Sequence, residues 1–127
     1  MNETFRQILF VGAGGFIGSV CRFGLGGLVY RIMPVPVLPY GTLAVNVVGC
    51  FLIGLFSAIV DMRAGISPEL RWLIFAGFLG GFTTFSAFGS ETFALLREEA
   101  HVRAAANVGL HMVVGLGAVW VGYSLGR

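Results

Sequence analysis

Apolar residues gather in four long stretches along the chain, separated by short polar or proline-rich segments. These stretches cover residues 8–30, 42–60, 70–96 and 104–125. Each one reaches the roughly 20 residues that an α-helix needs to cross the hydrocarbon core of a bilayer. The pattern predicts an all-α integral membrane protein, with four transmembrane helices in a single domain over residues 1–127.

The connecting segments carry signals that end helices and start new ones. Residues 33–41 hold three prolines, which end the first helix and form a short rigid loop. In the polar connector 61–71, Ser67 is of a type that caps helices, and Pro68 suits a first helical position. The third helix is therefore expected to begin there.

The third stretch contains the segment GFLGGFTTFSAFGSE, residues 77–91, whose composition does not suit a uniform membrane helix. Paired glycines cost about 1 kcal/mol each relative to Ala in a helix, and the β-branched Thr83 and Thr84 follow them. We therefore expect a break near Gly80. Since unwound backbone in a bilayer must be satisfied by protein, an ion or a water-filled cavity, this segment is the candidate ion or substrate site.

Polar and small residues inside the other stretches add candidates. Gly14 and Gly18 are four apart, a spacing that lets helix backbones approach closely. Arg22 is either an interfacial anchor or an anion-facing residue. Asn46 shares a helix face with Thr42, and either bonds a neighbouring helix or offers an uncharged N–H donor to a small anion.

Two further patterns can be read as packing or as a lined path. Phe85 and Phe88 are three apart and share a face if the chain is helical after the break. Asn107, His111 and Gly115 repeat every four residues, and so form one polar, narrow stripe on an apolar helix.

Composition supports the membrane assignment and excludes other classes. Hydrophobic residues make up 57% of the chain and charged residues 11%, about half the usual share in a soluble domain. The net charge is only +2 and no lysine occurs, so no basic surface for nucleic acid is expected. Cys21 and Cys50 lack metal-ligand spacing and receive no role. The start of the chain has no small-residue cleavage site typical of a removed signal peptide, and no set of catalytic residues indicates an enzyme.

The arginines are nearly balanced between the two sides of the predicted bundle. One side would hold Arg6, Arg63, Arg71 and Arg127, and the other Arg31, Arg97 and Arg103, with Arg22 close to the second surface. The positive-inside rule then selects no orientation, and insertion both ways round is expected. A four-helix chain of this size is too small to enclose a pore alone, so we expect an antiparallel, dual-topology homodimer.

Three motifs in combination resemble the Fluc (CrcB-type) family of bacterial fluoride channels over nearly the whole chain. They are GAGGFIGSVCR ending at Arg22, GTLAVN ending at Asn46, and the segment 77–91. The resemblance implies a channel of the bacterial inner membrane that exports fluoride passively, thereby lowers its cytoplasmic concentration, and has two pores per dimer. It also implies a structural Na⁺ at the dimer centre, bound by the backbone carbonyls of Gly80 and Thr83.

The same resemblance assigns Phe85 and Phe88 to the pore, Asn46 to its lining, Arg22 to the family's helix-one arginine and Glu91 to its acidic residue after the break. The chain departs from the family at Ala87 and Gly89, where hydroxyl residues are frequent, and at His111 and Gly115, where serines are frequent.

These residue types suit a small, strongly hydrated anion on chemical grounds as well. The hydroxyls of Thr84 and Ser86, the amide of Asn46 and the imidazole of His111 can donate hydrogen bonds without a trapping full charge. The positive edge of a phenylalanine ring can face an anion in a dry constriction.

Two other functions fit part of the pattern. Small proton-coupled drug exporters are also four-span dual-topology dimers, but that mechanism requires a carboxylate in the first helix, where this chain has Arg22. A non-transporting membrane assembly factor would explain the small residues, but not why the phenylalanines and the polar stripe occur together.

Overall fold

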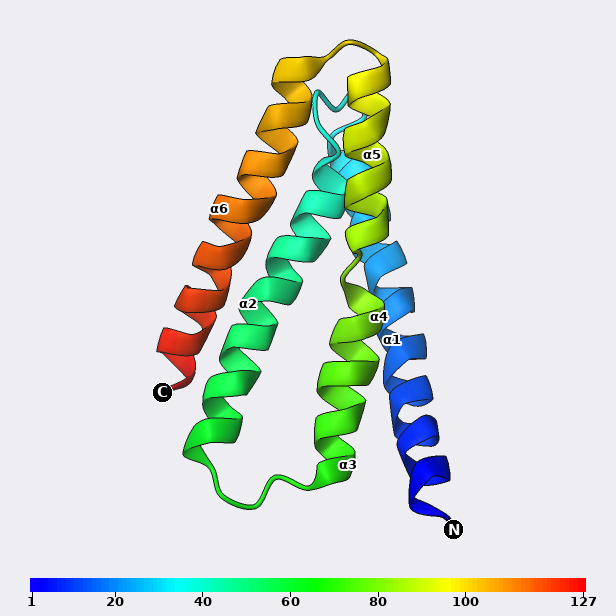
Figure 1. Cartoon of the computed structure of the whole chain (residues 1–127), viewed down its shortest axis with the longest axis vertical. Coiled ribbons are helices and arrows are strands. Elements are labelled where there is room, and N and C mark those ends of the chain that lie inside the picture. Colours follow the sequence, from blue (N-terminus) through cyan, green and yellow to red (C-terminus); the bar gives the residue numbers. More distant parts are fainter.

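The computed structural model describes residues 1–127 as helices that run alternately up and down, with both termini at the same end (Figure 1). The third of the four spans is divided into several segments. In chain order the elements are α1 (Glu3–Ile32), α2 (Tyr40–Met62), α3 (Pro68–Arg71), the π-helical η1 (Trp72–Leu79), α4 (Gly80–Phe82), α5 (Phe85–Arg97) and α6 (His101–Gly126). The all-helical class and the four spans predicted from the sequence are confirmed.

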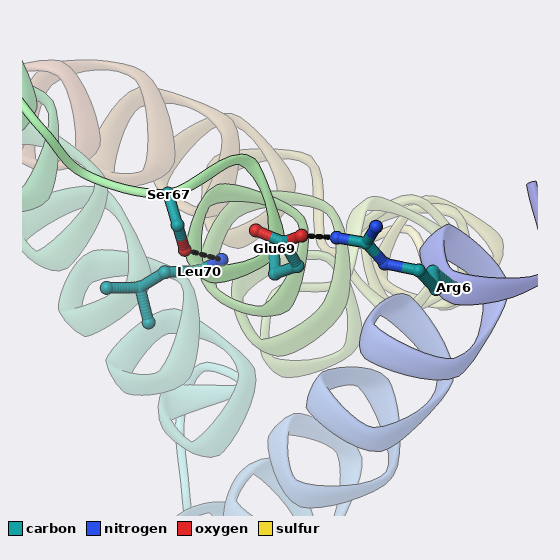
Figure 2. Close-up of polar contacts among 4 residues, drawn as sticks. All are labelled: Arg6, Ser67, Glu69 and Leu70. Carbon is teal, nitrogen blue, oxygen red and sulfur yellow. Dashed lines mark hydrogen bonds and ion pairs between the residues drawn. The ribbon is translucent and has the colours of Figure 1, made fainter. Parts of the chain in front are cut away.

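The helices extend a few residues beyond the apolar stretches, and polar side chains cap the starts of α1 and α3. Asn2 accepts a hydrogen bond from the Thr4 N–H at 2.9 Å, so α1 begins five residues before its predicted start. The side chain of Ser67 accepts from the Leu70 N–H at 3.3 Å with Pro68 at the first helical position, as predicted (Figure 2). In the same view, Arg6 forms an ion pair with Glu69 and ties the start of α1 to the start of the third span.

Close helix contacts depend on glycines. A Cβ added to Gly14 would collide with the carbonyl oxygen of Leu73, and one added to Gly18 with that of Phe78. The predicted role of this glycine pair in close packing is therefore confirmed. Gly54 and Gly122 make the equivalent contact between α2 and α6. The bundle thus consists of two tight pairs, α1 with η1 and α4, and α2 with α6.

The expected break in the third span is present, but it lies beyond Gly80. Gly80 is helical, with φ −62° and ψ −38°. The chain leaves helical geometry at Thr83 (φ −85°, ψ 155°) and Thr84 (φ −147°, ψ 109°), and α5 begins at Phe85. The low helix propensity of a glycine pair does not by itself unwind a helix that packs against α1. The helix unwinds where a side chain of α2 bonds the backbone N–H and C=O groups in place of the helix.

Most large apolar side chains point away from the bundle. Only 17 of the 127 residues are buried, whereas Phe23, Val102 and Trp120 are largely exposed. In water such a surface would be unstable, but in a bilayer the lipid chains cover it. The chain is therefore a multi-pass membrane protein, and its few buried residues are mostly glycines and apolar side chains, with the polar Thr42 and Asn107 among them.

Candidate functional site

The break in the third span is built around Asn46 of α2. Its side-chain Oδ1 accepts a hydrogen bond from the Thr84 N–H at 2.8 Å, and its Nδ2 donates to the Thr84 carbonyl at 3.0 Å. The amide thus pairs with both polar groups of one peptide residue, as a neighbouring strand would. This pairing also fixes which atom of the Asn46 amide is oxygen and which is nitrogen. The unwound backbone at Thr84 is satisfied by protein, as the bilayer requires.

The break releases carbonyl groups on its N-terminal side. In a continuous helix, the Gly80 carbonyl would accept from the Thr84 N–H, and the Thr83 carbonyl from the Ala87 N–H. Here the Thr84 N–H bonds Asn46, and the Ala87 N–H bonds the Thr84 hydroxyl at 3.1 Å, an N-cap of α5. The two carbonyls assigned to sodium by resemblance have therefore both lost their helical donors. Neutral carbonyl oxygens of this kind suit a monovalent cation.

Arg22 satisfies a third carbonyl of the same turn. Its Nε donates to the carbonyl oxygen of Gly81 at 3.0 Å, so the side chain lies against the break and does not extend freely to the membrane surface. The half-buried Arg22 thereby links α1 to the broken helix. Of the two interpretations given to this residue, a simple interfacial anchor does not describe its contacts.

The two phenylalanines after the break differ strongly in environment. Their ring centroids are 5.4 Å apart with planes tilted by 50°. Phe88 is 8% exposed and its ring lies 4.4 Å from the imidazole of His111, whereas Phe85 is 79% exposed. The predicted shared face is confirmed, and the exposed Phe85 has no covering partner within its own chain.

His111 of α6 bonds through both ring nitrogens. Nδ1 lies 2.9 Å from the Asn107 carbonyl oxygen, and Nε2 lies 3.2 Å from Nδ2 of Asn46. A carbonyl can only accept, so the proton of the neutral ring is on Nδ1 and Nε2 accepts from Asn46. In this arrangement the imidazole N–H is already used within the protein. The donor role expected for His111 from the sequence is therefore not available here without rearrangement.

A second polar contact between α5 and α6 was not assigned a role by the sequence. The fully buried Asn107 donates through Nδ2 to the Thr92 hydroxyl at 2.9 Å, and that hydroxyl donates to the Phe88 carbonyl at 2.7 Å. In the sequence, only the polar stripe that includes Asn107 pointed to this contact. Thr92 lies one residue beyond the segment 77–91, and nothing in the sequence marked it.

A cavity of about 280 Å³ lies between α1, α2 and α5. Its polar lining residues are Arg22, Tyr30, Thr42, Thr84 and Glu91. The Thr42 hydroxyl donates to Oε1 of Glu91 at 2.7 Å, whereas the buried Oε2 has no protein partner. The structure therefore brings Arg22, Thr84 and Glu91 to one cavity, which is expected of residues that belong to a single site.

An open groove of about 360 Å³ lies on the other side of the break. Its polar and glycine lining consists of Asn46, Gly49, Gly80, Thr83 and Thr84, and Phe85 stands at its edge. Thr84 thus borders both the cavity and the groove, and Asn46 lines the groove. Ser86 is exposed, with its hydroxyl 3.2 Å from that of Thr84. Gly115 is buried on the side of α6 that faces Cys50, away from these hydroxyls.

Comparisons with known proteins identify the family. Residues 9–123 match the family model described as CrcB-like protein, Camphor Resistance (CrcB). A protein of Methylobacillus flagellatus is 46% identical over 119 residues, which cover 94% of this chain and 93% of the relative. A protein of Rhizobium etli is 49% identical over 125 residues, covering 95% and 96%, and one of a Geobacter species is 45% identical over 122 residues, covering 96% and 98%. All three carry the name fluoride-specific ion channel FluC. With nine-tenths of its length matched by the family model and by these relatives, the chain belongs to the CrcB-like family.

Proposed function

We propose that this protein is a fluoride-specific channel that lets fluoride leave the cytoplasm passively and thereby lowers its concentration there. The relatives that cover almost the whole chain bear the name of a fluoride-specific ion channel. The observation that carries the proposal is the grouping of Asn46, Thr84, Phe88 and His111 at a helix break inside the membrane. All four groups are neutral: Asn46 and Thr84 carry hydrogen-bond donors, Phe88 carries a positive ring edge, and His111 bonds Asn46.

The chemistry of this grouping favours a small anion. Fluoride holds its water tightly, so a path through the bilayer must replace that water with compact donors at short range. Asn46 and the hydroxyls of Thr84 and Ser86 supply such donors, and Phe85 and Phe88 are their neighbours at the break. A larger halide forms weaker hydrogen bonds with these donors and fits less well between the rings. Arg22 and the Thr42–Glu91 pair line the cavity at the other side of Thr84, where an ion regains water.

The working unit in this proposal is an antiparallel homodimer. Polar backbone at the groove beside Gly80 and Thr83 cannot face lipid chains without a large cost, so protein must cover it. Phe85, 79% exposed at the edge of this groove, is placed to enter a second copy of the chain. A two-fold axis in the membrane plane joins the grooves of two oppositely oriented copies, and the balanced arginines permit both orientations.

Sodium would be a structural ion of that dimer. Two copies present four carbonyl oxygens, from Gly80 and Thr83 of each, and the N–H groups that would otherwise bond them are used by side chains. Four neutral oxygens suit a monovalent ion, because a divalent ion would require carboxylates. The ion would hold the two broken helices together and would not travel with fluoride.

A proton-coupled drug exporter is the weaker alternative. The one carboxylate deep in the bundle, Glu91, is on α5, where Thr42 donates to it, and α1 contributes Arg22 to the same cavity. An arginine on the first helix opposes the binding of cationic drugs. A channel also needs no chemical step, which agrees with membership of an ion-channel family.

The test is ion efflux from liposomes that contain purified protein. We expect fluoride to leave down its gradient, with the membrane potential clamped by a potassium ionophore, and chloride to be retained. Phe93→Ile serves as a control for general damage, since Phe93 is on α5 but 62% exposed and away from the lining. Equal loss of fluoride and chloride would refute the selectivity, and no fluoride loss would refute the function.

A further inference from the structure

The amide of Asn46 has no free hydrogen in this structure. One Nδ2 hydrogen is donated to the Thr84 carbonyl at 3.0 Å, and the other points to Nε2 of His111 at 3.2 Å. An anion that is to be bound by Asn46 must therefore take a hydrogen from one of these two acceptors. The Thr84 carbonyl is held in the two-bond pairing with Asn46, which the second bond, at 2.8 Å, reinforces. His111 is bound to Asn46 by a single contact and is the acceptor that yields.

We infer that His111 is a positioning residue of the anion path, which holds the second amide hydrogen of Asn46 while no anion is present and gives it up to a passing fluoride ion. This inference rests on the proposed function. It assigns to His111 the role of a neutral, replaceable acceptor and not that of a donor to the anion. Asn46 is the group that touches the ion, and His111 acts through Asn46.

The environment of His111 is built for this role. The Asn107 carbonyl accepts from Nδ1 at 2.9 Å, which places the lone pair of the neutral ring on Nε2, towards Asn46. The Phe88 ring lies 4.4 Å from the imidazole and limits its rotation. Asn107 itself is fully buried and bonded to Thr92, so the carbonyl that sets the tautomer is fixed in turn.

An acceptor of this kind makes transport faster. A buried donor left without a partner binds an arriving anion too tightly, because nothing replaces the ion when it leaves. A neutral imidazole satisfies the N–H without a charge, so fluoride displaces it at small cost, and it restores the hydrogen bond as fluoride departs. Removal of the acceptor should therefore lower the fluoride concentration for half-maximal flux and also lower the maximal flux.

The first experiment measures initial fluoride efflux against fluoride concentration for wild type, His111→Phe and His111→Gln. Phenylalanine keeps a ring against Phe88 but has no acceptor. We expect half-saturation to fall about fivefold, the equivalent of about 1 kcal/mol, the net value of one neutral hydrogen bond. Glutamine carries a carbonyl oxygen at the level of Nε2 and should restore half-saturation to within about twofold of wild type. A variant that merely loosens the bundle would lose flux without tighter half-saturation.

The second experiment needs no transport and no variant of His111. The chain has two histidines, so ¹⁵N-histidine labelling of the wild-type protein gives two pairs of ring-nitrogen signals, and His101→Gln assigns them. His101 begins α6 and is exposed, far from the candidate site. The His111 ring should be the Nδ1–H tautomer, and its Nε2 signal should shift when fluoride is added.

The outcomes separate the two proposals. A proton on Nε2 of His111, or an unchanged or raised half-saturation in His111→Phe, would overturn the role of His111 while leaving a wild-type fluoride flux intact. Absence of fluoride flux in the wild type would instead refute the proposed function. Tighter half-saturation in His111→Phe with rescue in His111→Gln supports both.

Discussion

Asn46 binds both backbone polar groups of Thr84, 38 residues away, and so replaces one turn of helix hydrogen bonding with a side chain. Asn46→Leu would leave the Thr84 N–H and C=O without partners, at about 1–3 kcal/mol for each buried group. We expect the fluoride flux of this variant to fall at least about tenfold, the factor that corresponds to 1.4 kcal/mol. Flux assays and thermal unfolding in detergent check this. Ser57→Ala, on the same helix but in a groove against α6, is the control and should match wild type.

The two phenylalanines should separate function from packing. Phe85→Ile and Phe88→Ile keep apolar bulk but lose the ring edge, so both should suppress fluoride flux while the protein remains folded. Because only Phe88 is buried, its replacement should also reduce stability, by about 1 kcal/mol, whereas Phe85→Ile should not. Fluoride flux of wild-type size in both variants would return the pair to a packing role.

Glycine substitutions on α1 should have opposite effects at two positions six residues apart. At Gly18 a Cβ collides with the Phe78 backbone, so Gly18→Ala should destabilise the protein by about 1–3 kcal/mol through overpacking. At Gly24 nothing lies within 4 Å, and Gly24→Ala should stabilise it by about 0.4–1 kcal/mol by restricting the unfolded chain. Melting temperatures in one detergent measure both. Equal shifts would contradict the close approach of α1 to η1 and α4.

Dual topology is tested by reporters on the C-terminus. Fusions to a fluorescent protein that works only in the cytoplasm and to a phosphatase that works only outside it should both be active. Because the arginines are so evenly shared, one added charge should bias insertion. Val35→Lys and Ala64→Lys, in loops at opposite ends of the bundle, should shift the ratio of reporter activities in opposite directions. A single orientation in the unmodified chain would end the antiparallel model.

Sodium removal should abolish fluoride flux without any net sodium movement. Within one chain, a Cβ at Gly80 would meet nothing closer than the Phe75 carbonyl oxygen, at 3.8 Å. Gly80→Leu should nevertheless weaken sodium binding and flux together, since the obstruction would arise from the ion and the second subunit. Thr83→Ser should be mild, because the main chain is the ligand. Flux that persists at trace sodium, or sodium that accompanies fluoride ion for ion, would sink this proposal.

Periodicity and residue type predicted the structural features that depend on residues close together in the sequence. Four apolar stretches gave four helices, the Ser67–Pro68 start was correct, and the spacing of Gly14 and Gly18 gave the close contact with the third span. These features depend on about 20 apolar residues, on one cap or on one helical face, all of which can be read locally.

The position of the break could not be read in this way. Gly80 has a weak helix preference and is helical, whereas Thr84 is unwound because Asn46 competes for its backbone. The same limit applies to the bond from Asn107 to Thr92 and to the tautomer of His111, which depend on how α5 and α6 meet. Contacts between two helices depend on the register of one helix against the other, and the periodicity of a single helix carries no information about that register.

The pairing of Asn46 with Thr84 also sets an unequal tolerance for mutation at its two ends. At position 46 the side chain makes the contacts, so only an amide of this length fits. Aspartate lacks the donor, and glutamine is one methylene too long. At position 84 the main chain makes the contacts with Asn46, and the side chain needs only the hydroxyl that caps α5 and lies beside that of Ser86, which serine also provides. Among sequences that keep this architecture, variation should therefore be found at 84 before it is found at 46.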